Sequence, residues 1–309
     1  MTAPPRRWIG PLCAVFGVLG FSFKAILIKL AYREYPVDAI TLLTLRMLYS
    51  APLFLAMAAW AHRAPGAAPR PSPIPRADRM RLIWLGCIGY YLASLYDFMG
   101  LQYITASLER LVLFLYPTLV VLLSALLLGQ PVTRRAVAAL VLSYAGIALV
   151  FWHDLRFAGN AGATLTGGGL VFASAILYAL YLVQAGGVIA RLGSARFIAW
   201  AMLASTVFVV AQFLLTRPVA ALAVPGRIHV LSIAMAIFST VLPTWLIAES
   251  IRRMGANAAS LVGSLGPVFT IGLGAMILGE PVHAIQLAGA ALVLGGVMMV
   301  TVKPRAAAR

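Results

Sequence analysis

The sequence predicts an all-α membrane protein, with ten transmembrane helices arranged as two inverted five-helix repeats. The first observation behind this prediction is composition: of 309 residues, 62% are hydrophobic and only 10% are charged. Soluble domains are about half apolar and about one quarter charged. So much apolar surface can be buried only if lipid surrounds the chain. A spanning helix needs about 20 mostly apolar residues, so this length has room for about ten.

The second observation is an internal repeat with an offset of 150 residues. The run Leu128-Gly129-Gln130-Pro131-Val132 returns as Leu278-Gly279-Glu280-Pro281-Val282, Pro117 returns as Pro267, and Gly146 returns as Gly296. A fixed offset of this kind indicates that the chain is built twice. We expect the first five-helix repeat over residues 1–155 and the second over residues 156–309.

Ten apolar segments can be drawn along the chain. They run approximately over residues 8–31, 37–61, 82–101, 104–128, 135–152, 168–190, 195–216, 228–251, 256–279 and 284–302. The first segment is too long for the core of a signal peptide, so we interpret it as a span. The longest polar connection covers residues 62–81, and a Gly-rich connection over 153–167 separates the two halves.

The distribution of Lys and Arg predicts the orientation. With a cytoplasmic N-terminus, sixteen of these residues fall in inside segments and four in outside loops. Cytoplasmic loops carry such an excess, so we expect both termini in the cytoplasm. Five spans per repeat is an odd number, and the second repeat must therefore cross the membrane in the opposite sense. The turn at 128–132 is then cytoplasmic and its copy at 278–282 is external.

These residues resemble a known family, the EamA-type members of the drug/metabolite transporter superfamily. The resemblance rests on the Leu-Gly-(Gln/Glu)-Pro-Val ends of spans four and nine, on Gly-Phe-Ser-Phe-Lys-Ala at 20–25, on Arg46, and on Arg-Met-Gly-Ala at 253–256. It covers nearly the whole chain. The resemblance implies a ten-helix inverted-repeat carrier with a central cavity, usually in the bacterial inner membrane, and the solute is left open.

Four ionisable residues at membrane depth are the first candidates for a solute site. At 1.5 Å per helical residue, Lys24 and Asp97 lie about 24 and 22 Å into their spans, while Arg46 and Glu109 lie about 13 and 7 Å in from the outside. All four fall in the outer half of the bilayer, where intramembrane charges mark solute and ion pathways. Two alternatives remain open: structural ion pairs between helices, or long side chains that reach the interface.

Aromatic and proline residues complete the candidate set. Tyr90, Tyr116 and Tyr178 lie on polar helix faces that we expect to point into the bundle, where they contact solute or form interhelical hydrogen bonds. Pro117 and Pro267 occupy equivalent mid-span positions. Because proline kinks a helix, we expect a role in gating, although proline is common in membrane helices.

The function that we expect is secondary transport of a small organic metabolite such as an amino acid, by alternating access and with proton coupling through Asp97 or Glu109. Export follows from the resemblance alone. The alternatives are an anionic metabolite, held by Lys24 and Arg46, and a membrane assembly subunit that transports nothing. We expect no enzyme activity and no cofactor, because catalytic and phosphate-binding motifs do not occur in the sequence. The expected partners are the solute and membrane lipid. Nucleic acid is excluded, since the basic residues lie between apolar runs.

Overall fold

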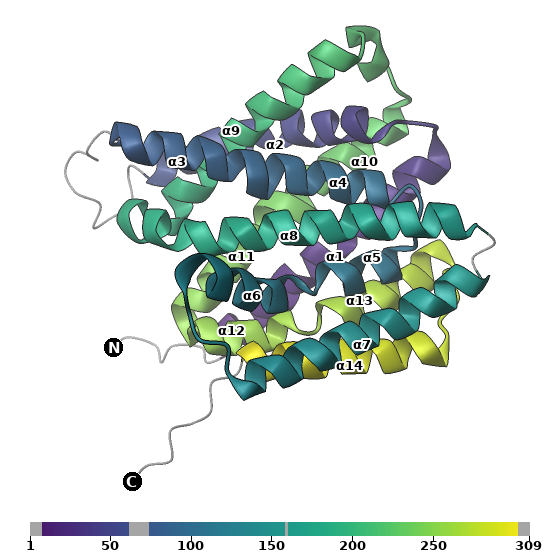
Figure 1. The fold of residues 1–309 in the computed structure, drawn as a ribbon. Helices are drawn as coiled ribbons and strands as arrows, with labels where there is room; N and C mark the ends of the chain where they lie inside the picture. Colours follow the sequence, from purple (N-terminus) through teal and green to yellow (C-terminus); the bar gives the residue numbers. More distant parts are fainter. Residues whose placement is uncertain (1–7, 62–73, 158–159, 302–309) are drawn as a thin grey trace.

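The computed structural model describes residues 8–61, 74–157 and 160–301, and within these ranges the chain runs as helices joined by short turns (Figure 1). The predictions for the two termini and for residues 62–73 of the polar connection lie outside the described residues. The helices are α1 (Ile9–Glu34), α2 (Ala39–Ala61), α3 (Arg76–Gly86), α4 (Ala93–Gly100), α5 (Ala106–Leu113), α6 (Tyr116–Leu128), α7 (Arg134–Phe157), α8 (Ala161–Leu192), α9 (Ser194–Thr216), α10 (Gly226–Ala236), α11 (Leu242–Met254), α12 (Ala256–Gly263), α13 (Gly266–Leu273) and α14 (Ala284–Thr301).

These helices form ten membrane-crossing units. Eight helical stretches of the described chain are long and apolar enough to cross a membrane, and two shorter apolar helices cover Gly266–Leu278 and Ala284–Met299. Some units are composite. Helix α3 continues through a π-helical segment, Cys87–Leu92, into α4, and α10 continues through Ile237–Val241 into α11. The predicted all-α fold of ten helices in two repeats is confirmed.

The repeat of the sequence returns in the backbone. The π-helical segments of spans three and eight begin at equivalent positions, since 237 − 87 = 150, whereas a third such segment, Gly274–Leu278 in span nine, has no copy in α6. Span four is interrupted between α5 and α6, and span nine between α12 and α13, again at equivalent places. Gly129 and Gly279 end these spans with φ of 65° and 66°. A residue with a Cβ is strained in this left-handed conformation, which explains glycine at both turns.

Two helices begin earlier than the apolar pattern predicts. Helix α8 begins at Ala161 and not near residue 168, because the side chain of Asn160 accepts a hydrogen bond from the backbone N–H of Ala163 at 3.0 Å and caps the helix. Helix α3 begins at Arg76 and not near residue 82, and its first turn holds Asp78, a favourable charge at a helix N-terminus. Polar helix ends extend beyond the apolar run, so hydropathy does not detect them.

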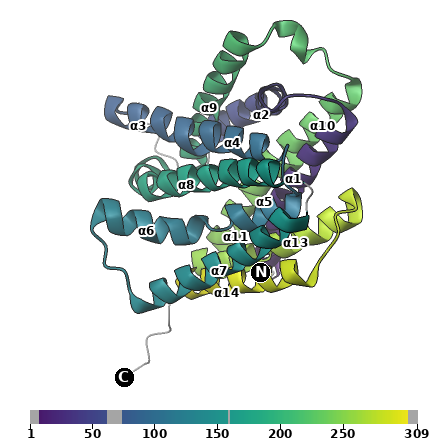
Figure 2. The same cartoon turned by 45° about the vertical axis from the view of Figure 1, so that its right-hand side comes forward.

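Helix α1 lies inside the bundle, where it contacts α5, α10, α11, α12 and α13 (Figures 1 and 2). Helices α7 and α14 pack along one another at one side. Two glycines that match in the repeat permit this close approach: a Cβ on Gly146 would lie 2.6 Å from the carbonyl oxygen of Gly289, and a Cβ on Gly296 would lie 2.6 Å from that of Ala139. Small residues of this kind let membrane helices approach closely.

Each end of the bundle contains one copy of the repeated turn, with Gln130 at one end and Glu280 at the other. The Glu280 end is at the right of Figure 1, where α4 ends and α8 begins. The Gln130 end is at the left, where α6 and α8 end and α3 begins.

Candidate substrate site

An ion pair inside the bundle joins two of the predicted site residues. The ammonium Nζ of Lys24 on α1 lies 2.7 Å from carboxylate Oδ2 of Asp97 on α4, and the two side chains are 17% and 2% exposed. Charged groups are stable away from water only when they are paired. The pairing explains how both residues are accommodated inside apolar helices.

Glu109 lies beside this pair. Its side chain on α5 is fully buried and interacts electrostatically with Asp97 and Lys24. Among the described residues, no group donates a hydrogen bond to either of its carboxyl oxygens. Two neighbouring carboxyl groups repel when both are ionised, so this arrangement favours a proton or a cationic group between Asp97 and Glu109.

Arg46 of α2 lies next to the same group of charges. It is 4% exposed, and its Nη2 donates a hydrogen bond to Oγ of Ser94 at 3.2 Å. Its guanidinium carbon lies 5.0 Å from the centre of the Phe98 ring, and Arg46 interacts electrostatically with Asp97. The structure thus brings together Lys24, Arg46, Asp97 and Glu109, called the ion cluster below. Their part in solute binding stays a prediction.

The three predicted tyrosines lie in a second group. The ring centres of Tyr116 and Tyr178 are 5.2 Å apart in an edge-on arrangement, and Tyr178 stacks on Tyr181 at 5.6 Å. The hydroxyl oxygens of Tyr181 and Tyr90 are 2.9 Å apart. These four residues form a tyrosine cluster between spans three, four and six. It contains residues of both repeats, whereas the ion cluster belongs to the first repeat alone.

Arg110 connects the two clusters and was missed in the sequence. Its Nε donates to Oγ1 of Thr270 at 3.0 Å, and its Nη2 donates to the backbone carbonyl of Phe21, so it joins α5 to α13 and α1. It also interacts electrostatically with Glu109 and Tyr116. A cation adjacent to Glu109 inside a span was the available signal. Its proximity to the start of the span made it look like an interfacial residue.

Polar side chains that the sequence did not single out connect helices at the Glu280 end. The carboxylate of Glu280 accepts hydrogen bonds from the backbone N–H of Ala106 at 2.8 Å and from that of Ser107 at 3.2 Å. On α1, Lys29 donates to the carbonyls of Leu101 and Ile104 at 3.1 and 2.9 Å, and Arg33 donates to the carbonyl of Leu278 at 2.6 Å. These contacts hold spans one, four and nine together at this end.

The two prolines begin helices after the breaks in spans four and nine. Pro117 and Pro267 each lie in the first turn of a new helix, α6 and α13. Proline is tolerated there because its missing N–H would have no partner in any case. The predicted kinks are therefore present as helix breaks, and their role in gating stays a prediction.

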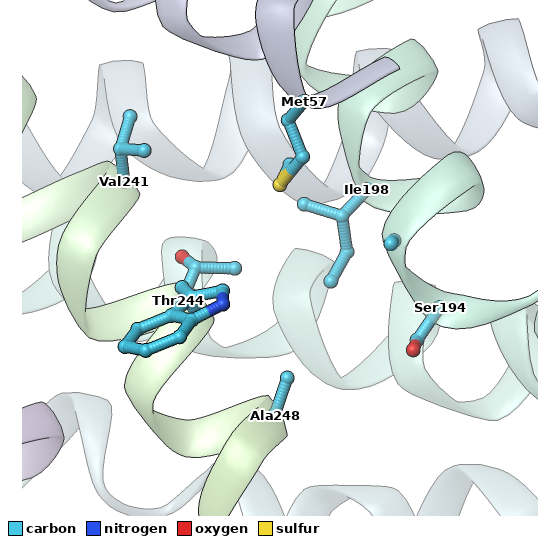
Figure 3. A pocket seen from close by; sticks show the side chains of 8 residues that line it. Met57, Ser194, Ile198, Val241, Thr244 and Ala248 are labelled. Atoms are coloured by element: carbon cyan, nitrogen blue, oxygen red, sulfur yellow. The ribbon is translucent and has the colours of Figure 1, made fainter. Parts of the chain in front are cut away.

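A cavity of about 290 Å³ lies between α2, α9 and α11 at the Gln130 end (Figure 3). Its walls are mostly apolar, and they consist of Met57, Ser194, Ala195, Ile198, Val241, Thr244, Trp245 and Ala248. The predicted site residues do not line it. The cavity has an open side and is not an enclosed chamber.

Comparison with known proteins gives the family. The model of the EamA-like transporter family matches this chain twice, at residues 8–152 and at residues 165–302. The chain belongs to the EamA-like transporter family. The resemblance drawn from the repeated turns is thus confirmed, and the protein is a multi-pass membrane transporter of the EamA type in the drug/metabolite transporter superfamily.

Individual relatives agree with this assignment. The uncharacterized transporter YcbK of Bacillus subtilis is 30% identical over 303 residues, which cover 94% of this chain and 91% of the relative. A protein of Streptantibioticus cattleyicolor, named "Probable terminal-alkyne amino-acid exporter", is 27% identical over 73% of this chain and 74% of its own length. A solved crystal structure superposes with a TM-score of 0.62 at 20% identity, over 94% of this chain and 95% of the other, which shows a shared fold.

Proposed function

We propose that this EamA-type transporter is a secondary carrier that moves an amino acid or a similar zwitterion by alternating access, in the direction of export. The observation that carries the proposal is the buried pair of Lys24 and Asp97 beside a Glu109 carboxyl without a protein donor. A zwitterion carries one carboxylate and one ammonium. Its carboxylate can pair with Lys24 while its ammonium pairs with Asp97 and Glu109, so every buried charge keeps a partner.

The tyrosine cluster supports the same proposal. Two residues connect it to the ion cluster. Arg110 interacts electrostatically with Tyr116, and Ser94, which accepts a hydrogen bond from Arg46, lies one helical turn from Tyr90. Aromatic rings give a solute side chain an apolar surface, and their hydroxyls can donate or accept hydrogen bonds. The relative named as an amino-acid exporter agrees with a zwitterionic solute.

An anionic metabolite is the second candidate, and Arg110 is the observation that favours it. With Arg110 included, three cations, the buried Arg46 and the half-buried Lys24 and Arg110, lie near the two buried acids Asp97 and Glu109. A solute carboxylate or phosphate would neutralise the excess positive charge.

Counterflow into liposomes separates the two candidates. The purified protein is reconstituted in vesicles that contain an excess of one unlabelled solute, and uptake of the same labelled solute is followed for neutral amino acids, dicarboxylates and phosphorylated acids. Under the first proposal, amino acids give counterflow and the anions do not. Counterflow with anions alone would replace the first proposal by the second. No counterflow with any of these solutes would contradict both.

Proton coupling is part of the proposal, with Glu109 as the group that carries the proton. The support is its position next to Asp97, where a proton relieves the repulsion between two carboxyl groups when no solute ammonium is present. Loading the solute would then release the proton. A pH gradient across the vesicle membrane should drive accumulation of the solute, and a protonophore should abolish it.

We place the protein in the bacterial inner membrane, with two five-helix repeats divided near residues 155 and 156 and with the Gln130 end and both termini in the cytoplasm. The supporting observation is the excess of Arg at the Gln130 end, at the ends of α3, α7, α8 and α11. Val132 and Val282 are equivalent and equally exposed, at 41% and 42%. In a variant without Cys13 and Cys87, a cysteine at 282 should react with an impermeant thiol reagent on intact cells, and a cysteine at 132 only after lysis.

A further inference from the structure

Glu280 is a buried acid in the turn after span nine, and its carboxylate occupies the N-terminus of another helix. Its side chain is 7% exposed. It accepts hydrogen bonds from the backbone N–H groups of Ala106 and Ser107, and from Oγ of Ser107 at 2.9 Å. The hydroxyl oxygen of Thr105 accepts the next N–H, that of Leu108, at 3.1 Å. The first N–H groups of α5 therefore all have acceptors, and a negative charge lies at the favourable end of the helix.

This contact lies on the helix that carries one residue of the ion cluster. Helix α5 has only eight residues, Ala106–Leu113, and it carries Glu109 one turn after the residues that Glu280 binds. A helix this short is not stable on its own and takes its position from its contacts. The contact between Glu280 and α5 therefore helps to set the position of Glu109 relative to Lys24 and Asp97, together with the contacts of Arg110 to α13 and α1.

The equivalent residue in the first repeat is in the opposite situation. Gln130 stands where Glu280 stands, after a glycine with the same left-handed φ, and its side chain is exposed. The preceding leucines show the same difference: Leu278 is 4% exposed and Leu128 is 57% exposed. By the repeat, the helix on which Gln130 would dock is α12, which begins at Ala256 as α5 begins at Ala106.

We propose that Glu280 is a positioning residue for transport: its docking on α5 closes the Glu280 end, and docking of Gln130 on α12 closes the Gln130 end in the alternate state. The inference deepens the proposed alternating access and rests on it. The structure corresponds to the state in which the Glu280 end is closed.

The two docking contacts differ in strength, and the difference sets the resting state. A carboxylate offers two charged acceptor oxygens, whereas the amide of Gln130 offers one neutral acceptor. Helix α1 also holds both sides of the Glu280 contact through Lys29 and Arg33, and the equivalent positions of α8 are Ala179 and Val183. The closed Glu280 end is therefore favoured when no solute is bound.

Gly274 provides a way to displace the carboxylate without changing Glu280. A Cβ on Gly274 would lie 2.9 Å from Oε2 of Glu280 and 3.3 Å from Oγ of Ser107, so Gly274→Ala pushes the end of a flexible side chain away from α5. The matched control is Gly272→Ala, two residues earlier, where a Cβ would meet nothing within 4 Å. Glu280→Gln is the second variant, because it keeps the shape and removes the charge.

The test measures thiol reactivity at both ends in full-length protein without Cys13 and Cys87, reconstituted in liposomes. Leu278→Cys reports on the Glu280 end and Leu128→Cys on the Gln130 end. Gly274→Ala and Glu280→Gln should raise the labelling rate of the cysteine at 278 by about tenfold, the factor for one charge-assisted hydrogen bond, and should lower that of the cysteine at 128. Gln130→Glu should do the reverse, and Gly272→Ala should change neither rate.

A reciprocal change at the two ends supports the proposal, because a purely local structural role of Glu280 would not alter the distant cysteine. Equal behaviour of Gly274→Ala and Gly272→Ala, or a rise of both labelling rates together, would overturn it. The readout needs no solute. Its failure is therefore distinguishable from failure of the proposed transport, which the counterflow measurement tests separately.

Discussion

The two repeats share their backbone and differ in their charges. Both contain a π-helical segment in the third span of the repeat, a break within the fourth span and a left-handed glycine at the end of that span, at positions 150 residues apart. Three charges of the ion cluster have no charged copies, because Lys24, Asp97 and Glu109 correspond to Ser174, Ile247 and Ala259, whereas Arg46 corresponds to Arg196. Ile247 packs near Gly17 on α1, and Ala259 is buried. Uncharged residues thus replace the lysine and both acids of the ion cluster in the second repeat.

Alternating access needs some features in both repeats and others in only one. Opening to either side requires two similar sets of turns and helix breaks, because each set serves one side. A single solute needs a single set of charges. We therefore expect that transport is sensitive to substitutions in the ion cluster of the first repeat and not to substitutions at the equivalent positions of the second. Substitutions that disturb helix packing should lower stability equally in both repeats.

The largest effect is expected for Asp97→Ala. It removes the carboxylate that lies 2.7 Å from the ammonium of Lys24, and breaking such a pair costs about 3–5 kcal/mol of unfolding free energy. The substitution should also abolish counterflow. Thermal unfolding and counterflow measure the two effects. Asp78→Ala is the matched control, because Arg191, the partner of Asp78, is 47% exposed and can return to water. Normal transport by Asp97→Ala would show that the charges found only in the first repeat are not needed for transport.

Glu109→Gln should separate exchange from proton coupling. The amide keeps the size of the side chain and cannot release a proton, so counterflow should persist while accumulation driven by a pH gradient is lost. Glu34→Gln is the control, since Glu34 pairs with Arg227, which is 72% exposed. Gradient-driven accumulation that survives in Glu109→Gln would assign the proton to another group.

Packing of the repeats can be compared directly with Gly146→Ala and Gly296→Ala. In each variant the new Cβ meets a carbonyl oxygen of the other helix at 2.6 Å, so α7 and α14 must separate. Each substitution should lower the unfolding free energy by about 1–3 kcal/mol, the usual cost of overpacking. Gly186→Ala, where nothing lies within 4 Å, is the control. A large effect of one variant and none of the other would contradict the equivalence of the two repeats.

The smallest effect is expected for Tyr90→Phe. Its hydroxyl is 2.9 Å from that of Tyr181, and loss of one neutral hydrogen bond costs about 1 kcal/mol. We expect a KM for the solute about fivefold higher with an unchanged maximal rate, which the concentration dependence of counterflow measures. Tyr103→Phe serves as the control because Tyr103 is 47% exposed and lies in the turn before α5. An unchanged KM would remove the tyrosine cluster from the solute site.

The sequence was sufficient for the number and type of helices, because runs of apolar residues and the 150-residue offset are direct consequences of a lipid environment and of duplication. It also placed Lys24 and Asp97 at similar depth, since depth follows from the helical rise alone. The predicted starts of α3 and α8 were wrong because the first turns of these helices hold polar residues, such as Asp78 in α3, or follow a capping residue, Asn160 before α8, and hydropathy does not detect either.

The contacts at the Glu280 end could not be predicted. Glu280 lies in a turn that reads as exposed, and only the packing of spans four and nine brings it to the N-terminus of α5. The depth of a residue along its span does not tell in which direction its side chain points around the helix axis. It therefore could not predict that Asp97 pairs with Lys24 while Arg46 lies against Phe98. Gln130 and Glu280 have almost the same neighbours in the sequence, but the Gln130 side chain is exposed and the Glu280 side chain is buried against α5. The sequence pattern alone therefore could not distinguish them.

The most direct test of the ion cluster as the solute site is counterflow by the double variant Lys24→Met and Asp97→Asn. Replacement of both partners removes the ion pair without leaving either of its two charges unpaired, so the fold should survive with little change in unfolding temperature. If the ion cluster binds the solute, this double variant should fold, insert into the membrane as the original protein does and show no amino-acid counterflow. Counterflow at the original rate in the variant without the Lys24–Asp97 pair would contradict a solute site at the ion cluster.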